Sequence, residues 1–133
     1  MSKAVLSVVA EAMATLGIEY GFGEYYGDPI VYPYYVGEYA ETEPLEEDGL
    51  QESTFMLTGF ARESAFPGGA WLALENTKEQ IERYFHKITG KTVITGEGTA
   101  VAVFYAGAQP IPTGEADLKR IQINLHTKEW SVT

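Results

Sequence analysis

The stretch EPLEEDGLQESTFMLTGFAR, residues 43–62, decides the expected fold. A block of acidic residues runs through Asp48-Gly49 into a segment in which apolar residues recur. Asp-Gly is a strong hairpin signal, because glycine tolerates a positive φ. Residues 31–42 before it and 52–61 after it have the composition of β-strands. We therefore expect an antiparallel hairpin that turns at Asp48-Gly49.

The second of these strands has two distinct faces. Successive side chains of a strand point to opposite sides. The strand should place Phe55, Leu57, Gly59 and Ala61 on one face and Thr54, Met56, Thr58 and Phe60 on the other.

Two segments have helical periodicity. Residues 3–16 should form a helix that ends at Gly17 and buries Val5, Val8, Val9, Ala12, Met13 and Leu16. A second helix is expected over 76–89, because Asn76 and Glu79 match a capping box and Gly90 can close the end. Its apolar face consists of Ile81, Tyr84, Phe85 and Ile88.

The last third of the chain should add strands to the sheet. Residues 91–95 predict a short strand. Residues 100–106 are apolar on both faces and predict a central strand of the sheet. Residues 107–117 contain two prolines and read as a loop, and 118–127 alternate with Ile121, Ile123 and Leu125 inward. The predicted fold is one α+β domain over residues 1–133, with two helices packed on a mainly antiparallel β-sheet.

The composition excludes several classes of protein. The chain of 133 residues contains no cysteine, which excludes disulfides and thiolate metal sites. Its formal net charge is -10, and eleven acidic residues but no Lys or Arg lie between Lys3 and Arg62. Conventional nucleic-acid binding needs basic residues that neutralise phosphates. Without a signal peptide or membrane span, we expect a cytosolic product.

The acidic residues gather at the expected hairpin tip. They are Glu41, Glu43, Glu46, Glu47, Asp48 and Glu52. Like charges there keep the chain in solution and block edge-to-edge pairing of sheets. The alternative is a surface that repels an anion such as DNA.

Tyrosines form the other unusual cluster. Seven of the nine lie between Ile18 and Tyr39, and the candidate interface consists of Tyr25, Tyr26, Tyr32, Tyr34, Tyr35 and Tyr39. Tyrosine is enriched at protein interfaces. One face of a tyrosine-rich strand can serve the core instead, so a partner and a core role both remain open.

No specific catalytic signal is present. His86 and His126 are far apart in sequence, without HExxH or a third candidate ligand, and His86 reads as a solvated surface residue. GFGEYYG, residues 21–27, spaces its third glycine wrongly for a dinucleotide fingerprint. We therefore expect no catalytic residues, no metal site and no cofactor.

A family resemblance rests on three segments. YPYYVGEY (32–39), EEDGLQESTFMLTGFAR (46–62) and ENTKEQIERYF (75–85), together with chain length and element order, resemble the tail-completion, or tail-terminator, proteins of long-tailed bacteriophages and prophages. The likeness covers essentially the whole chain.

The resemblance implies a structural, non-enzymatic protein of the virion tail, made in the bacterial cytoplasm. Such proteins form a homo-hexameric ring on the tail tube, where they meet the major tail protein and the head connector. DNA passes through without specific binding, and an acidic lumen would let it slide. The alternative is a small bacterial ligand-binding protein or enzyme with an α+β fold and a tyrosine-lined pocket.

Overall fold

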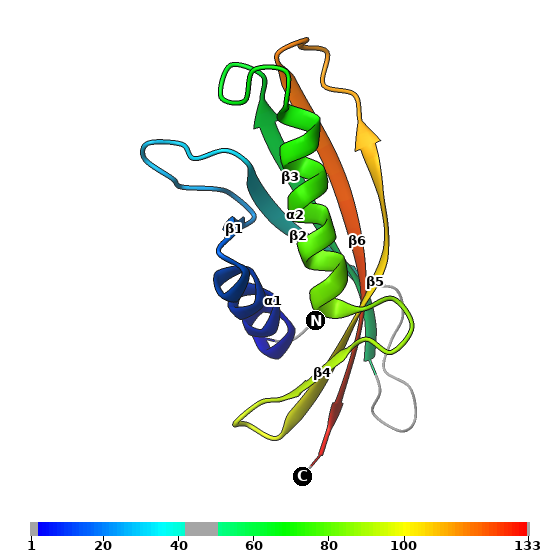
Figure 1. The fold of residues 1–133 in the computed structure, drawn as a ribbon. Coiled ribbons are helices and arrows are strands. Elements are labelled where there is room, and N and C mark those ends of the chain that lie inside the picture. The colour runs from blue at the N-terminus through cyan, green and yellow to red at the C-terminus, as the bar shows by residue number, and fades with distance from the viewer. Residues whose placement is uncertain (1–2, 42–50, 133) are drawn as a thin grey trace.

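The computed structural model describes residues 3–41 and 51–132. The elements follow in the order α1 (Lys3–Leu16), β1 (Glu19–Phe22), β2 (Tyr34–Glu41), β3 (Gln51–Arg62), α2 (Ala70–Phe85), β4 (Lys91–Ile94), β5 (Thr99–Ile111) and β6 (Leu118–Ser131). These strands join one six-stranded sheet, which curls along its length (Figure 1). The expected α+β class is confirmed.

The strands lie in the order β1-β2-β3-β6-β5-β4 across the sheet. β1 runs parallel to β2, and the other neighbouring pairs are antiparallel. The centre of the sheet is formed by β3, β6 and β5, which contain 12, 14 and 13 residues. This long central part provides two extended faces.

One face of β3 and β6 is buried and the other is half-buried, whereas residues 100–103 of β5 are buried on both faces. Buried and half-buried residues alternate along β3 and β6, as the sequence pattern predicts. The buried positions include Phe55, Leu57, Gly59 and Ala61 of β3 and Ile121, Ile123 and Leu125 of β6. Apart from Gly59, these residues share one core with residues of both helices. The opposite side, which carries the even-numbered residues of β3 and β6, is called the open face below.

Helix α1 agrees with its prediction. Its buried residues are Val5, Val8, Val9, Ala12 and Met13, and Leu16 is half-buried. The helix stops before Gly17, which adopts φ 70° and donates its N–H to the carbonyl of Ala14. A positive φ is accessible to glycine at little steric cost, so this residue ends the helix.

The predicted start of α2 is wrong. The helix begins at Ala70, and its N-cap residue, Gly69, makes no side-chain capping bond. Its buried stripe consists of Ala70, Leu74, Ile81 and Phe85 and extends a turn and a half before the capping-box motif. Burial of this stripe outweighs a local cap signal.

The predicted end of α2 also differs. The helix closes at Phe85, and Ile88, expected on its apolar face, lies beyond it and is 88% exposed. His86 has φ 62° and is exposed, as expected for a surface residue. Its carbonyl accepts a hydrogen bond from the Tyr105 N–H. This contact ties the end of α2 to β5.

Several strands differ from their expected limits, and β6 continues to Ser131 instead of ending at residue 127. β5 does have neighbours on both sides, but it continues to Ile111 through residues expected to form a loop. A bulge between Tyr105 and Gly107, where Gly107 has φ 129°, absorbs the irregularity. β1 was not predicted. It is only four residues long, so its periodicity is too short to recognise.

The hairpin prediction is supported by strand pairing. β2 and β3 are antiparallel neighbours, with Tyr34 opposite Phe60 and Glu41 opposite Ser53. β2 begins at Tyr34 rather than at residue 31. The expected turn at Asp48-Gly49 lies outside the described residues.

Candidate functional site

The connection between β1 and β2 folds back along both strands. The Gly23 N–H donates to the carbonyl of Gly37 over 2.9 Å. The backbone of Glu24 lies so close to Gly21 that a Cβ on this glycine would overlap the Glu24 carbonyl. The Tyr25 hydroxyl donates to Glu19 Oε1 at 2.9 Å. These contacts fix residues 23–25 beside the open face.

A row of stacked rings runs from this connection across the sheet. The Tyr25 and Tyr34 ring centroids are 4.4 Å apart, and those of Tyr34 and Phe60 are 5.1 Å apart. Burial raises the pKa of Tyr34. Phe60 lies opposite Arg120 of β6, so the row ends in a guanidinium. The three rings form a rigid wall on the open face.

Arg62 ties three segments together beside this wall. Its Nε donates to the Tyr32 hydroxyl at 3.0 Å, and Nη1 forms ion pairs with Glu115 at 3.2 Å and Asp117 at 3.4 Å. The hydrogen bond to Tyr32, followed by that to Glu115, raises the pKa of Arg62. The planar guanidinium can satisfy several acceptors at once, so Arg62 holds the loops before β2 and β6 in place.

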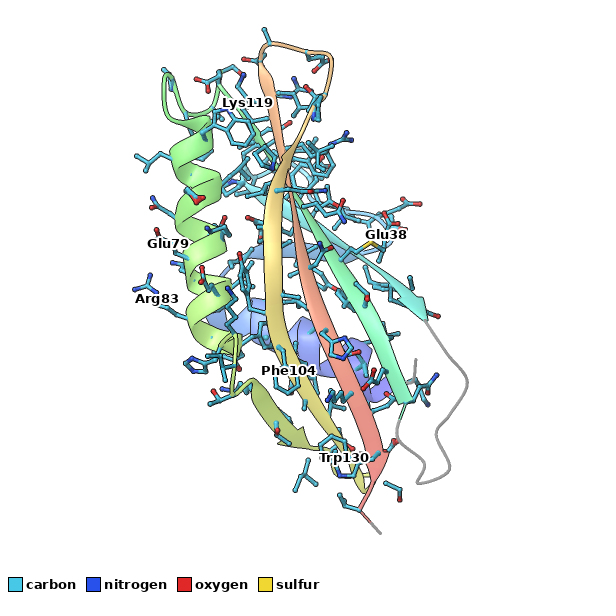
Figure 2. The ribbon with its side chains drawn as sticks, turned by 90° about the vertical axis from the view of Figure 1, so that its right-hand side faces the viewer. Glu38, Glu79, Arg83, Phe104, Lys119 and Trp130 are labelled. Carbon is cyan, nitrogen blue, oxygen red and sulfur yellow. The ribbon has the colours of Figure 1, made fainter. Side chains whose placement is uncertain are left out.

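A groove of about 460 Å³ opens beside the ring wall. Val36 and Thr58 are opposite one another and form its floor, whereas Tyr34 and Phe60 rise along one side. Glu24, Glu38 and Arg120 also line it. Figure 2 shows Glu38 on the side of the sheet away from α2. The groove falls within the range of roughly 300–1,000 Å³ that is common for ligand sites.

Arg120 carries a donor that the described residues do not satisfy. Its Nη2 donates to the Pro112 carbonyl at 2.8 Å. Its Nε is buried and has no hydrogen-bond partner in the described part of the chain. Buried donors are usually paired, so this guanidinium stands out on the open face.

A smaller hollow of about 130 Å³ lies between α2 and β5. Trp71, Ala108 and Pro110 line it, together with the Lys78–Glu75 ion pair of 3.3 Å. It is below the usual size of ligand sites.

The structure divides the predicted tyrosine interface into three groups. Tyr35 is completely buried, and its hydroxyl lies 2.7 Å from Thr77 Oγ1 of α2. The interface assignment is therefore corrected for this residue, which belongs to the core. Tyr25 and Tyr34 are half-buried in the ring wall, Tyr32 is half-buried beside it, and Tyr26 and Tyr39 are exposed.

Tyr26 and Tyr39 belong to a concentration of exposed apolar side chains. Residues 22–39 contain Phe22, Tyr26, Ile30, Val31 and Tyr39, each at least 41% exposed. These are five of the ten large hydrophobic residues that are exposed in the described part of the chain. The Phe22 and Tyr39 rings stack at 5.9 Å. Segment 22–39 therefore presents apolar surface at the β1 edge of the sheet.

Of the predicted acidic surface, only the Glu52 side chain can be placed. Glu43, Glu46, Glu47 and Asp48 lie outside the described residues, as does the side chain of Glu41. The Glu52 carboxylate lies 3.8 Å from Lys128 Nζ and 3.7 Å from His126 Nε2. Lys128 partly offsets the charge of Glu52, and the assignment of this side chain to a repulsive surface stays a prediction.

The described residues contain no cluster of three or more His, Asp or Glu side chains that could hold a metal ion. Over the same residues, neither helix has the length and apolar character needed to cross a membrane. Comparison with protein-family models and with curated protein sequences finds no match.

The sequence pattern did not reveal the groove. Strand alternation places Phe60 on the face opposite Phe55 and Leu57, but its pairing with Arg120 requires the β3–β6 register. The stacking of Tyr25 on Tyr34 requires the path of residues 23–33. The signal that was available is the alternation that sets Thr58, Phe60 and Arg120 outward.

Proposed function

We propose that this chain is a structural, non-enzymatic phage or prophage protein that completes the tail. In this proposal it caps the tail tube and joins it to the head connector, in a ring of identical copies around the DNA channel. Its partners are the major tail protein and the connector, and its place is the virion tail. The proposal draws on the resemblance given above and on the surface of the fold.

The observation that carries the proposal is the exposed apolar surface of segment 22–39. Monomeric proteins rarely expose large contiguous apolar patches, and such patches mark interaction sites. Tyr26 is 79% exposed and Ile30 is 54% exposed beside the edge strand β1. A neighbouring copy that covers these side chains would remove them from water and protect the sheet edge.

The charge distribution supports a channel that does not hold DNA. Residues 4–41 contain acidic but no basic residues. A surface of this sign repels phosphates over roughly one Debye length, about 8 Å at physiological salt. Copies arranged with this part inward let DNA pass without specific contacts.

The first test measures assembly by light scattering over a range of protein and salt concentrations. We expect self-association that increases with salt, because salt screens the repulsion between acidic copies and leaves aromatic burial intact. A tail tube assembled from the major tail protein should bind the chain at its end. The proposal would be refuted if the chain stays monomeric at high salt and does not bind the tail tube.

Matched variants locate the interface. The double variant Tyr26→Ala, Tyr39→Ala should reduce association, because it removes two exposed rings from segment 22–39. Ile88→Ala is the control, since this side chain is also large, apolar and 88% exposed but lies elsewhere in the chain. Equal association of both variants and wild type would exclude segment 22–39 as the interface.

A second candidate function is ligand binding by a small bacterial protein, with or without catalysis. The specific observation in its favour is the groove of about 460 Å³ lined by Tyr25 and Tyr34. This function predicts a monomer that is saturated by a small molecule. Light scattering therefore distinguishes it from the ring.

A further inference from the structure

The shape of the groove follows from side-chain size in neighbouring rows of the sheet. Val36 and Thr58 are paired across β2 and β3. The row on one side contains Tyr34 and Phe60, and the row on the other contains Glu38 and Met56. The short side chains of Val36 and Thr58 therefore leave this groove as a trough, bounded by Tyr34 and Phe60 on one side and by Glu38 on the other. Its long walls and open top suit an elongated ligand.

One end of the trough is acidic. The hydrogen bond from Gly23 to Gly37 brings the residues that follow them, Glu24 and Glu38, to the same edge. Both are exposed and line the trough. Within the described residues neither carboxylate forms an ion pair, so this end can accept a cationic group.

The opposite end is basic. Arg120 lies in the same cross-strand row as Tyr34 and Phe60, two strands away from β2. Its bond to Pro112 fixes the guanidinium, and its Nε has no partner in the described part of the chain. The fixed charge suits a carboxylate or another strong acceptor.

The distance between the two ends defines the ligand further. Arg120 and Glu38 are separated by two strand spacings and by four residues along the strands. Strand spacings of about 4.8 Å and rises of about 3.3 Å give a diagonal of roughly 16 Å. An extended peptide covers this distance with about five residues. Nucleic acid is disfavoured, because Glu24 and Glu38 repel phosphates.

We propose that this trough binds an extended peptide segment of a partner protein with a basic side chain and, three to six residues away, an acidic one. The basic group meets Glu24 and Glu38, and the acidic group meets Arg120. The backbone between them crosses Val36 and Thr58 along the ring wall. This inference does not depend on ring assembly. Several lining residues belong to segment 22–39, but the exposed rings Tyr26 and Tyr39 that would contact another copy do not line the trough.

The experiment uses the full chain, labelled with ¹⁵N, and acetylated, amidated peptides. The probes contain one Lys and one Glu separated by Thr-Val repeats, with spacings of three to six residues. Two matched peptides replace Lys by norleucine or Glu by Gln. Two-dimensional NMR follows the backbone amides of Val36 and Thr58. We expect saturable shifts with at least one probe and roughly 1.5-fold to fivefold weaker binding of both neutralised peptides.

Variants assign the two ends. Glu24→Gln with Glu38→Gln should weaken binding roughly threefold to tenfold without disturbing the fold, since both side chains are exposed. Glu79→Gln, an equally conservative change on the outer face of α2 (Figure 2), should bind like wild type. Arg120→Lys should weaken binding less than Arg120→Gln, because it keeps the charge.

Three results would overturn the inference. The first is that no peptide, whatever its spacing, shifts the amides of Val36 and Thr58. The second is that charged and neutralised peptides bind equally well. The third is that Glu79→Gln weakens binding as much as the double variant at Glu24 and Glu38 does. A monomeric protein that binds the peptide would refute the ring and retain the trough. A ring-forming protein that binds none of the peptides would refute the trough and retain the ring.

Discussion

Replacement of Tyr35 tests the division of the tyrosine cluster most directly. The Tyr35 side chain is completely buried, and its ring lies so close to Gly59 that an added Cβ there would come within 2.4 Å of it. Truncation of a buried aromatic residue to alanine typically costs about 3–5 kcal/mol, from lost burial and the remaining cavity. Total stability of a natural domain is about 5–15 kcal/mol. Tyr35→Ala should therefore remove a large part of it.

Tyr35→Phe separates the ring from its hydroxyl. The hydroxyl lies 2.7 Å from Thr77 Oγ1, which is itself 2.9 Å from the Leu74 carbonyl that accepts its hydrogen bond. Because Thr77 keeps this second partner, loss of the Tyr35 hydroxyl should cost only about 1 kcal/mol. If Tyr35→Ala is far less stable than Tyr35→Phe, packing of the ring is the main contribution of Tyr35 to stability.

Urea denaturation followed by far-UV circular dichroism gives the free energies of unfolding. Tyr26→Ala is the control, because Tyr26 is 79% exposed and its truncation should change stability by no more than about 0.5 kcal/mol. The reasoning fails if the free energy of unfolding of Tyr35→Ala lies within about 1 kcal/mol of the wild-type value, with a midpoint at about the same urea concentration. It also fails if the Tyr26 variant loses as much stability as the Tyr35 variant.

Two further predictions concern Tyr20 and Gly59. Burial raises the pKa of Tyr20 from 10.0 to about 12, so the free energy of unfolding should hold below pH 10 and fall between pH 10 and about 12, where the unfolded chain loses its phenol proton first. Urea curves at stepped pH measure this fall. Tyr20→Phe should reduce this loss of stability at alkaline pH. Because the buried Tyr20 hydroxyl has no partner among the described residues, the variant should keep its stability at pH 7 or gain up to about 1 kcal/mol. An unchanged dependence of stability on pH above 10 would contradict the assignment. Gly59→Ala should lower stability by about 1–3 kcal/mol, because the added Cβ overlaps the Tyr35 ring. Gly96→Ala is the control, since its Cβ meets open space and should leave stability unchanged. Equal melting temperatures of the two variants would refute this packing.

Local patterns were sufficient where each residue's neighbours in sequence decide its environment. The alternation in β3 and β6 predicted their buried faces because side chains on a strand alternate strictly. The stripe of α1 predicted its buried residues for the equivalent helical reason, and Gly17 marked its end. Together these elements were enough to predict an α+β fold.

Local patterns failed where a distant contact outweighed them. The cap signal at Asn76 predicted a start for α2, but burial of Ala70 and Leu74 extends the helix to an uncapped glycine. β5 continues past Gly107 because β6 pairs with it on the far side of a bulge. Both differences arise from packing partners that are remote in sequence.

The candidate site shows the same division more strongly. The sequence alone determined that this chain is acidic, free of cysteine and rich in tyrosine before residue 40. Only the tertiary structure decided that Tyr35 enters the core, that Tyr34 joins the ring wall and that Tyr26 stays in water. These residues have the same side chain, so composition cannot tell them apart. Strand register and the path of the connection before β2 set their neighbours, and the neighbours decide whether a ring is buried, stacked or available to a partner.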